Sequence, residues 1–243
     1  PQDPNDEPAS VLLKRIAEEK ARLVKEKVIR KSDPLPAVRA DEVPFEVPAG
    51  WVWCRLATVC ASLTDGDHMP PPRDRAGVAF LTIGNISRGS LDFAETRFVP
   101  ESYYSSLDPS RSPRVGDILY TVVGATYGRP ALVDTDRSFC VQRHIAIVRP
   151  ASSVGSAYLC TFLRSPVAYA QASARKTGSA QPTLPLGPLR LFAVPLPPLV
   201  EQHGIVARVD ALMGICDGLE SSLRAANDAR GQFAAAAVQR VGL

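Results

Sequence analysis

A heptad segment at the end of the chain most constrains what this sequence can fold into. After the proline-rich run 195–198, which stops any preceding helix or strand, apolar residues recur at alternating spacings of four and three. The seam consists of Ile205, Val209, Leu212, Cys216, Leu219 and Leu223. Residues 199–243 therefore predict a single helix, roughly 60 Å long at ~1.5 Å per residue.

A rod of this length cannot bury its seam against itself, so it needs another helix. Three partners are open: a helix at the start of this chain, the same rod in a second copy, or a helix of another protein. An ordinary core helix is the alternative interpretation of such a stripe. The length of the repeat and the proline stop before it favour packing in a coiled coil or bundle.

A second helix is predicted at the other end of the chain, over residues 9–31. Pro8 suits a first turn, and an apolar stripe that includes Leu13, Ile16 and Leu23 follows among charged residues. The proline-containing run 32–36 ends it. The predicted domains are an N-terminal helix at 1–33, a linker at 34–50, a globular domain at 51–198 and the heptad helix at 199–243.

The segment 51–198 changes to short β-prone runs between turn residues. Strands are expected at 51–56, 78–83, 117–123, 131–133 and 145–149, and helices at 101–107 and 155–165. The predicted fold class is therefore α+β. It combines one mixed α/β domain with a twisted sheet and two long helices packed as an antiparallel coiled coil or bundle.

Charge and composition narrow the function classes. Residues 51–198 carry 15 basic and 10 acidic residues, and every basic residue except Lys176 is Arg, which favours binding to phosphates and guanine edges. No apolar run approaches the ~20 residues of a membrane helix. Five cysteines without a CxxC pair argue against a disulfide framework or a zinc site, and they favour a reducing, cytoplasmic location.

Several polar loops of the globular domain are candidates for contact with nucleic acid, each with a bland alternative. The loop 64–75 is an ordinary turn or a base- and phosphate-reading loop, Asn85 caps a turn or pairs with adenine, and the glycines near Tyr127 mark turns or allow close approach to phosphates. The basic stretch 175–181 suits backbone anchoring. The candidate DNA-binding residues are Thr64, His68, Arg73, Arg75, Thr82, Asn85, Ser87, Arg88, Tyr127, Arg129, Arg175, Lys176, Ser179 and Gln181.

A metal site is not expected, because His68 and its neighbouring aspartates lack a convincing fourth ligand. No adenine-methylation motif and no glycine-rich loop suited to S-adenosylmethionine can be identified. No catalytic residue is therefore assigned, and the chain is expected not to be an enzyme.

Seven strings stand out in order along the chain: VPAGWVW at 47–53, TDGDH at 64–68, FLTIGNI at 80–86, GDILYTVVGATYG at 116–128, FCVQRHI at 139–145, TGSAQPTL at 177–184 and PLPPLVEQ at 195–202. Together with the opening PQDPNDEP and the first helix, they resemble the DNA-specificity subunit of type I restriction–modification enzymes. The family's subunit has two target-recognition domains separated by long helices that dock methyltransferase subunits. This chain has one such domain, so it looks like half of a two-domain subunit, a fragment of one, or a half-sized form that dimerises.

The resemblance implies the following expectations. The chain would read half of a split target in double-stranded DNA, while its helices dock methyltransferase subunits and, through them, restriction subunits. It would hold no cofactor, because S-adenosylmethionine would bind the methyltransferase subunit. Two other classes stay open: a coiled-coil scaffold without DNA specificity, and a methyltransferase, which the missing cofactor motif disfavours.

Overall fold

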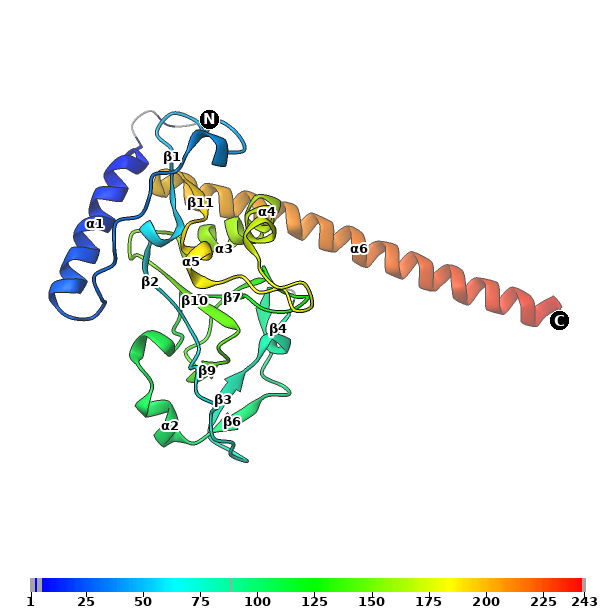
Figure 1. The fold of residues 1–243 in the computed structure, drawn as a ribbon. Coiled ribbons are helices and arrows are strands. Elements are labelled where there is room, and N and C mark those ends of the chain that lie inside the picture. Colours follow the sequence, from blue (N-terminus) through cyan, green and yellow to red (C-terminus); the bar gives the residue numbers. More distant parts are fainter. Residues whose placement is uncertain (1–2, 4–5, 88, 242–243) are drawn as a thin grey trace. The chain divides into compact units, whose positions relative to one another are not determined.

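The computed structural model describes residue 3, residues 6–87 and residues 89–241, and it divides into two compact units (Figure 1). The first unit runs from Pro1 to Gln202 and the second from His203 to Leu243. The helices are α1 (Ala9–Lys25), α2 (Glu101–Ser106), α3 (Ser156–Arg164), α4 (Pro166–Arg175), α5 (Leu186–Arg190) and α6 (Leu199–Val241). Short 3-10 turns lie at Ala40–Glu42, Leu56–Thr58, Ile83–Asn85 and Pro109–Arg111.

The first unit contains several small sheets where the sequence predicts one twisted sheet. A four-stranded antiparallel sheet has the order β2 (Cys60–Asp65), β10 (Ile145–Pro150), β7 (Ile118–Thr121), β8 (Pro130–Leu132). A three-stranded sheet has the order β6 (Arg97–Val99), β3 (Val78–Leu81), β9 (Phe139–Val141), with β3 and β9 parallel. Two further pairs join β1 (Val52–Arg55) to β11 (Ala193–Leu196) and β4 (Ile86–Ser87) to β5 (Ser90–Leu91).

The continuous apolar runs of β7 and β10 are explained by burial on both faces of the larger sheet. Successive side chains of a strand point to opposite faces. In β7, Ile118 and Tyr120 enter a core shared with α1, α3 and α4, while Leu119 enters a second core shared with β3 and β9. In β10, Val148 and Ile147 divide in the same way. The larger sheet therefore has helices α1, α3 and α4 packed on one face and the three-stranded sheet packed on the other.

The first helix ends earlier than residue 31, which corrects the sequence-based boundary. The helix stops at Lys25 because Lys27 takes a left-handed backbone conformation, with φ at 59°. The N–H of Val28 donates to the carbonyl of Leu23 at 2.9 Å, and the N–H of Lys27 to that of Val24 at 3.0 Å. This pair of bonds is the Schellman termination, which satisfies the last carbonyls of a helix.

The apolar face of α1 packs inside the first unit. Leu12 and Ile16 are each 1% exposed and belong to the core that also contains β7, and Leu13 packs against its edge. Leu23 is half-buried. The helix-packing residues expected on this helix are therefore used largely for the domain core, and α1 is not left as a free partner for a coiled coil.

The heptad helix is one continuous element, α6, as the sequence predicts. In the single chain Leu212, Leu219 and Leu223 are 47%, 60% and 66% exposed, and Cys216 is also exposed. Ile205 and Val209 are half-buried. Within the described residues no helix is both long enough and apolar enough to cross a membrane.

Candidate DNA interface

A cationic groove lies between the loop that follows β2 and the ends of the smaller sheet. It is a cavity of about 330 Å³ whose walls come from the 67–73 loop, from β3 and β6, and from the turn after β9. Phe80, Phe98 and Val99 form an apolar side. The remaining lining residues are Asp67, His68, Met69, Pro70, Pro71, Pro72, Arg73, Arg97, Gln142, Arg143 and His144.

Gly66 makes this groove possible. A Cβ atom at residue 66 would lie 2.0 Å from the carbonyl oxygen of Val141, so only glycine lets the loop cross so close to β9. The next residue, Asp67, then forms a parallel bridge with Gln142. The backbone thereby brings two loops that are more than seventy residues apart in sequence to the same site.

Positive charge dominates the groove. Arg73, Arg97 and Arg143 are all exposed, and within the described part of the chain Arg73 and Arg97 form no ion pair. Asp67 supplies the one carboxylate among the lining residues, and the hydroxyl of Tyr103 donates to it at 3.0 Å. Burial, and then this bond to Asp67, raises the pKa of Tyr103. Three exposed guanidinium groups thus line the groove beside one already engaged carboxylate, and Nε of Arg143 donates to Nε2 of His144 at 3.4 Å.

The two histidines that line the groove, His68 and His144, differ in burial and in hydrogen-bond partners. Burial, and then the nearby Arg143 guanidinium, lowers the pKa of His144, which favours the neutral ring. The side-chain amide nitrogen of Gln142 lies 2.9 Å from its Nδ1. His68 is exposed, with Nε2 3.0 Å from the carboxylate of Asp65, which also pairs with Arg111. His144 is half-buried and lines the groove.

A second group of candidates gathers where two loops meet at the end of β7. The N–H of Gly124 donates to the carbonyl of Pro182 at 2.9 Å, and Thr177 and Thr183 exchange backbone bonds of 2.7 and 2.8 Å. The tip of this hairpin exposes Lys176, Ser179 and Gln181. Tyr127, only 7% exposed, lies beneath, and Arg129 is exposed at the end of its loop.

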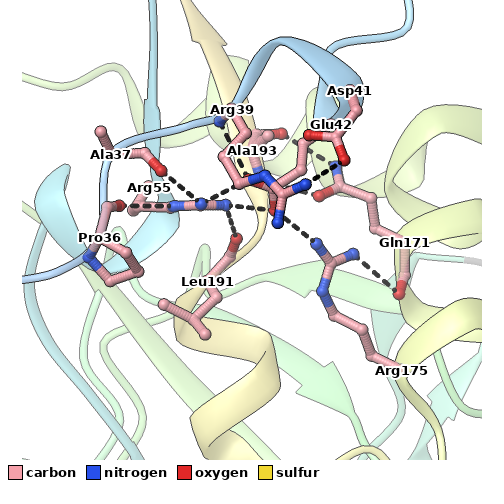
Figure 2. A network of polar contacts seen from close by, with 10 residues as sticks. All are labelled: Pro36, Ala37, Arg39, Asp41, Glu42, Arg55, Gln171, Arg175, Leu191 and Ala193. Carbon is pink, nitrogen blue, oxygen red and sulfur yellow. Dashed lines mark hydrogen bonds and ion pairs between the residues drawn. The ribbon is translucent and has the colours of Figure 1, made fainter.

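Arg175 lies in an internal network, although the sequence suggested phosphate contact. Figure 2 shows its guanidinium beside Glu42, which also receives two bonds from Arg55. Arg55 is 5% exposed and donates further to the carbonyls of Pro36, Ala37 and Leu191. The Arg55 bonds lower the pKa of Glu42 to about 2. A carboxylate between two guanidiniums fixes the linker to the domain, so Arg175 does not join Lys176 at the surface.

Of its two predicted roles, capping a turn or pairing with adenine, Asn85 has the first in this structure. Its Oδ1 accepts from the N–H and the hydroxyl of Thr82, both at 2.9 Å, and its amide donates to the carbonyls of Asp92 and Glu95. Both residues are therefore occupied in a turn rather than presented to a ligand. Arg88 and the side chain of Ser87 lie outside the described residues.

The remaining candidates lie at the start and the end of the groove loop. Thr64 is half-buried in β2, where it pairs with Ile147. Arg75 is exposed three residues before β3. Neither residue lines the groove.

Three residues that were not among the candidates from the sequence belong to these two surfaces: Arg97, Arg143 and Tyr169. Arg97 opens β6 and Arg143 lies in the turn after β9, so both reach the groove only through strand pairing. Tyr169 lies on α4 and stacks on Tyr127. The sequence signal that could have indicated Arg97 and Arg143 is that each arginine lies next to a short apolar strand run.

The described residues define a single mixed α/β head, carrying cationic loops, followed by a long heptad helix. This is the fold of known specificity subunits. One solved structure, which describes complex assembly and conformational transition of the type I R-M system, matches 88% of this chain and 51% of its own with a TM-score of 0.58 and 22% identity. The HsdS subunit from Thermoanaerobacter tengcongensis matches 88% of this chain and 49% of its own, with a TM-score of 0.56 and 22% identity.

Curated sequences point the same way. The chain is 34% identical to the Escherichia coli type I restriction enzyme EcoEI specificity subunit and 31% identical to the EcoAI specificity subunit, over 93% of its length in each case. It spans 39% of the length of each of these relatives. No protein-family model matches it. The resemblance stated from the sequence is confirmed: the chain belongs to the family of type I restriction enzyme specificity subunits and corresponds to one recognition domain with its helices.

Proposed function

We propose that this chain recognises a sequence in double-stranded DNA as the specificity component of a type I restriction–modification complex, reading one half of a split target. The observation that carries the proposal is the groove with three exposed arginines. Guanidinium groups bind phosphates and the O6/N7 edge of guanine through paired hydrogen bonds, and the amide of Gln142 could serve an adenine edge. The two Escherichia coli relatives are specificity subunits of type I restriction enzymes, which supports the same function.

In this proposal the chain has no catalytic role of its own. Methylation and cleavage belong to other subunits, S-adenosylmethionine binds the methyltransferase subunit, and the assembly acts in the cytoplasm. The exposed apolar seam of α6 supports docking of methyltransferase subunits or of a second copy of this chain. A scaffold without DNA specificity is not favoured, because the relatives are specificity subunits and a scaffold gives no reason for the cationic groove.

The test is a binding titration of the purified chain with a fluorescent duplex over a range of salt concentrations. We expect affinity to fall with salt at a logarithmic slope of about −0.9 for each phosphate contacted. Replacing Arg73 and Arg97 by Ala should weaken binding by at least tenfold, since two charge-assisted contacts are removed. The matched control is Arg114→Ala, which removes one exposed charge outside the groove.

Equal losses in the groove variant and in the control would contradict the proposed site, and salt-independent or undetectable binding would contradict the function. A second measurement addresses sequence specificity. Methylome sequencing of a host that expresses this chain with its methyltransferase partner should show a split motif for two different recognition domains, or a palindromic one for two copies of this chain.

A further inference from the structure

A second surface of the same unit combines an exposed aromatic ring with a free cation. The rings of Tyr127 and Tyr169 stack with centroids 5.6 Å apart and planes inclined by 15°, and Nζ of Lys176 lies 5.1 Å from the centre of the Tyr127 ring. The hydroxyl of Tyr127 lies 3.0 Å from that of Ser173, which fixes the inner ring. Tyr169, the outer ring, is 49% exposed. We call Tyr127, Tyr169 and Lys176 the tyrosine platform.

Glycines allow the close approaches in both loops of the platform. Gly128 has φ at 85°, and a Cβ there would lie 3.1 Å from the Tyr169 ring, so glycine allows the ring to lie flat over the loop. Gly178 has φ at 78°, and a Cβ would lie 2.6 Å from the carbonyl of Gln181. The backbone bonds between Thr177 and Thr183, 2.7 and 2.8 Å long, close the hairpin that carries Ser179 and Gln181.

The local charge is positive. The segments 124–129 and 166–183 contain no Asp or Glu, whereas they contain Arg129, Arg175 and Lys176. Arg175 is turned towards Glu42, which it shares with Arg55, whereas Arg129 and Lys176 are exposed. Within the described residues the side chains of Ser179 and Gln181 make no hydrogen bond to protein. These two loops thus present an exposed ring, two cations and two polar side chains and hold no acidic residue of their own, which suits a polyanion that also offers flat apolar groups.

We propose that the tyrosine platform is a second DNA contact, separate from the arginine groove, at which Tyr169 packs against a deoxyribose of one strand and Lys176 binds the neighbouring phosphate. This inference rests on the proposed DNA-binding function and adds the site that holds the backbone. Tyrosine suits the position because its ring supplies apolar area with few rotatable bonds. Contacts to sugar and phosphate set the orientation of the protein on the duplex and carry no sequence information themselves.

The ring and the cation make separable predictions, measured with the full chain and a fluorescent duplex at several salt concentrations. Tyr169→Ala should weaken binding about five- to tenfold with an unchanged salt slope, because packing against a sugar displaces no counterion. Tyr169→Phe, the matched control, should bind within twofold of the unmodified chain, since the ring is kept. Lys176→Ala should make the salt slope shallower by about 0.9 and weaken all duplex sequences alike.

The outcomes distinguish the two proposals. If Tyr169→Ala binds DNA within twofold of the unmodified chain while the Arg73 and Arg97 variant loses binding, the platform inference fails and the DNA-binding function stands. If Tyr169→Ala keeps DNA binding but no longer copurifies with the methyltransferase subunit, the platform is a protein contact and the inference is overturned. If the unmodified chain binds no DNA, both fail. Thermal melting of each variant shows whether a loss comes from unfolding, and the Lys176→Ala slope tests the site independently of Tyr169.

Discussion

At the scale of single residues, the neighbouring carboxylates of Glu42 and Asp41 should differ in how much they stabilise the fold, because their arginine partners differ in burial. Glu42 binds Arg55, which is buried, and Arg175, which is three-quarters buried. Asp41, its neighbour, pairs with Arg39, whose side chain is 74% exposed. Exposed pairs of that kind contribute little to stability, whereas a buried guanidinium left without its anion is costly.

Glu42→Gln should therefore lower the free energy of unfolding at pH 7 by about 2 kcal/mol, as for loss of hydrogen bonds to a charged group. Because the folded-state pKa of Glu42 is about 2, below the ordinary 4.5, its contribution is complete above pH 4.5 and disappears as the pH falls towards 2. Urea unfolding of variant and parent should differ most at pH 7 and converge near pH 2.

The control for this prediction is Asp41→Asn, which should change stability by less than about 0.5 kcal/mol at either pH. A constant difference between Glu42→Gln and the parent from pH 7 to pH 2 would show that the carboxylate charge is not what stabilises the network.

At the scale of elements, the end of α1 is an unusual termination. Lys27 occupies the left-handed position where glycine is preferred, and it is the one non-glycine residue with positive φ recorded among the described residues. A Cβ atom in that conformation costs about 1 kcal/mol. The helix tolerates this because Val28 and Leu23 close the Schellman bonds.

Lys27→Gly should raise the free energy of unfolding by up to about 1 kcal/mol, measured by urea denaturation. Glu26→Gly is the control: Glu26 has an ordinary helical φ of −77°, so glycine there should destabilise the protein by about 0.5–1 kcal/mol. Two substitutions one residue apart are thus expected to have opposite signs, and equal signs would contradict the account of the helix end.

At the scale of the whole molecule, the unit formed by residues 203–243 cannot be explained by its own contacts. Its seam leucines are about half to two-thirds exposed in the single chain, whereas Leu12 and Ile16 of α1 are each 1% exposed. Exposed apolar rows on a long helix are typical of helix–helix association.

If the seam docks the methyltransferase subunit, as proposed above, Leu219→Glu should abolish that assembly, because it places a charge within the exposed apolar seam. Ser221→Glu adds the same charge two residues away, off the seam, and should leave assembly unchanged. Size-exclusion chromatography with light scattering checks both. Coelution of Leu219→Glu at the mass of the intact complex would contradict a role for the seam.

The sequence by itself determined the features that depend on local order. The heptad spacing predicts α6, and the apolar runs at 78–83, 117–123 and 145–149 predict strands to within a few residues of their bounds, because periodicity and proline stops act within one element. The order of the seven motifs along the chain was enough to indicate the family. The end of α1 was missed because a lysine occupies the left-handed position where glycine is the usual signal.

Only the tertiary structure decided which polar residues face outwards. Arg175 and Lys176 are neighbours in sequence, yet one is bound by Glu42, 133 residues away, and the other is exposed. Arg73, Arg97 and Arg143 come from three separate loops and strand ends, and they meet because β3 pairs with both β6 and β9. Pairing between distant segments determines these positions, and nothing in the local sequence of each segment specifies its partner.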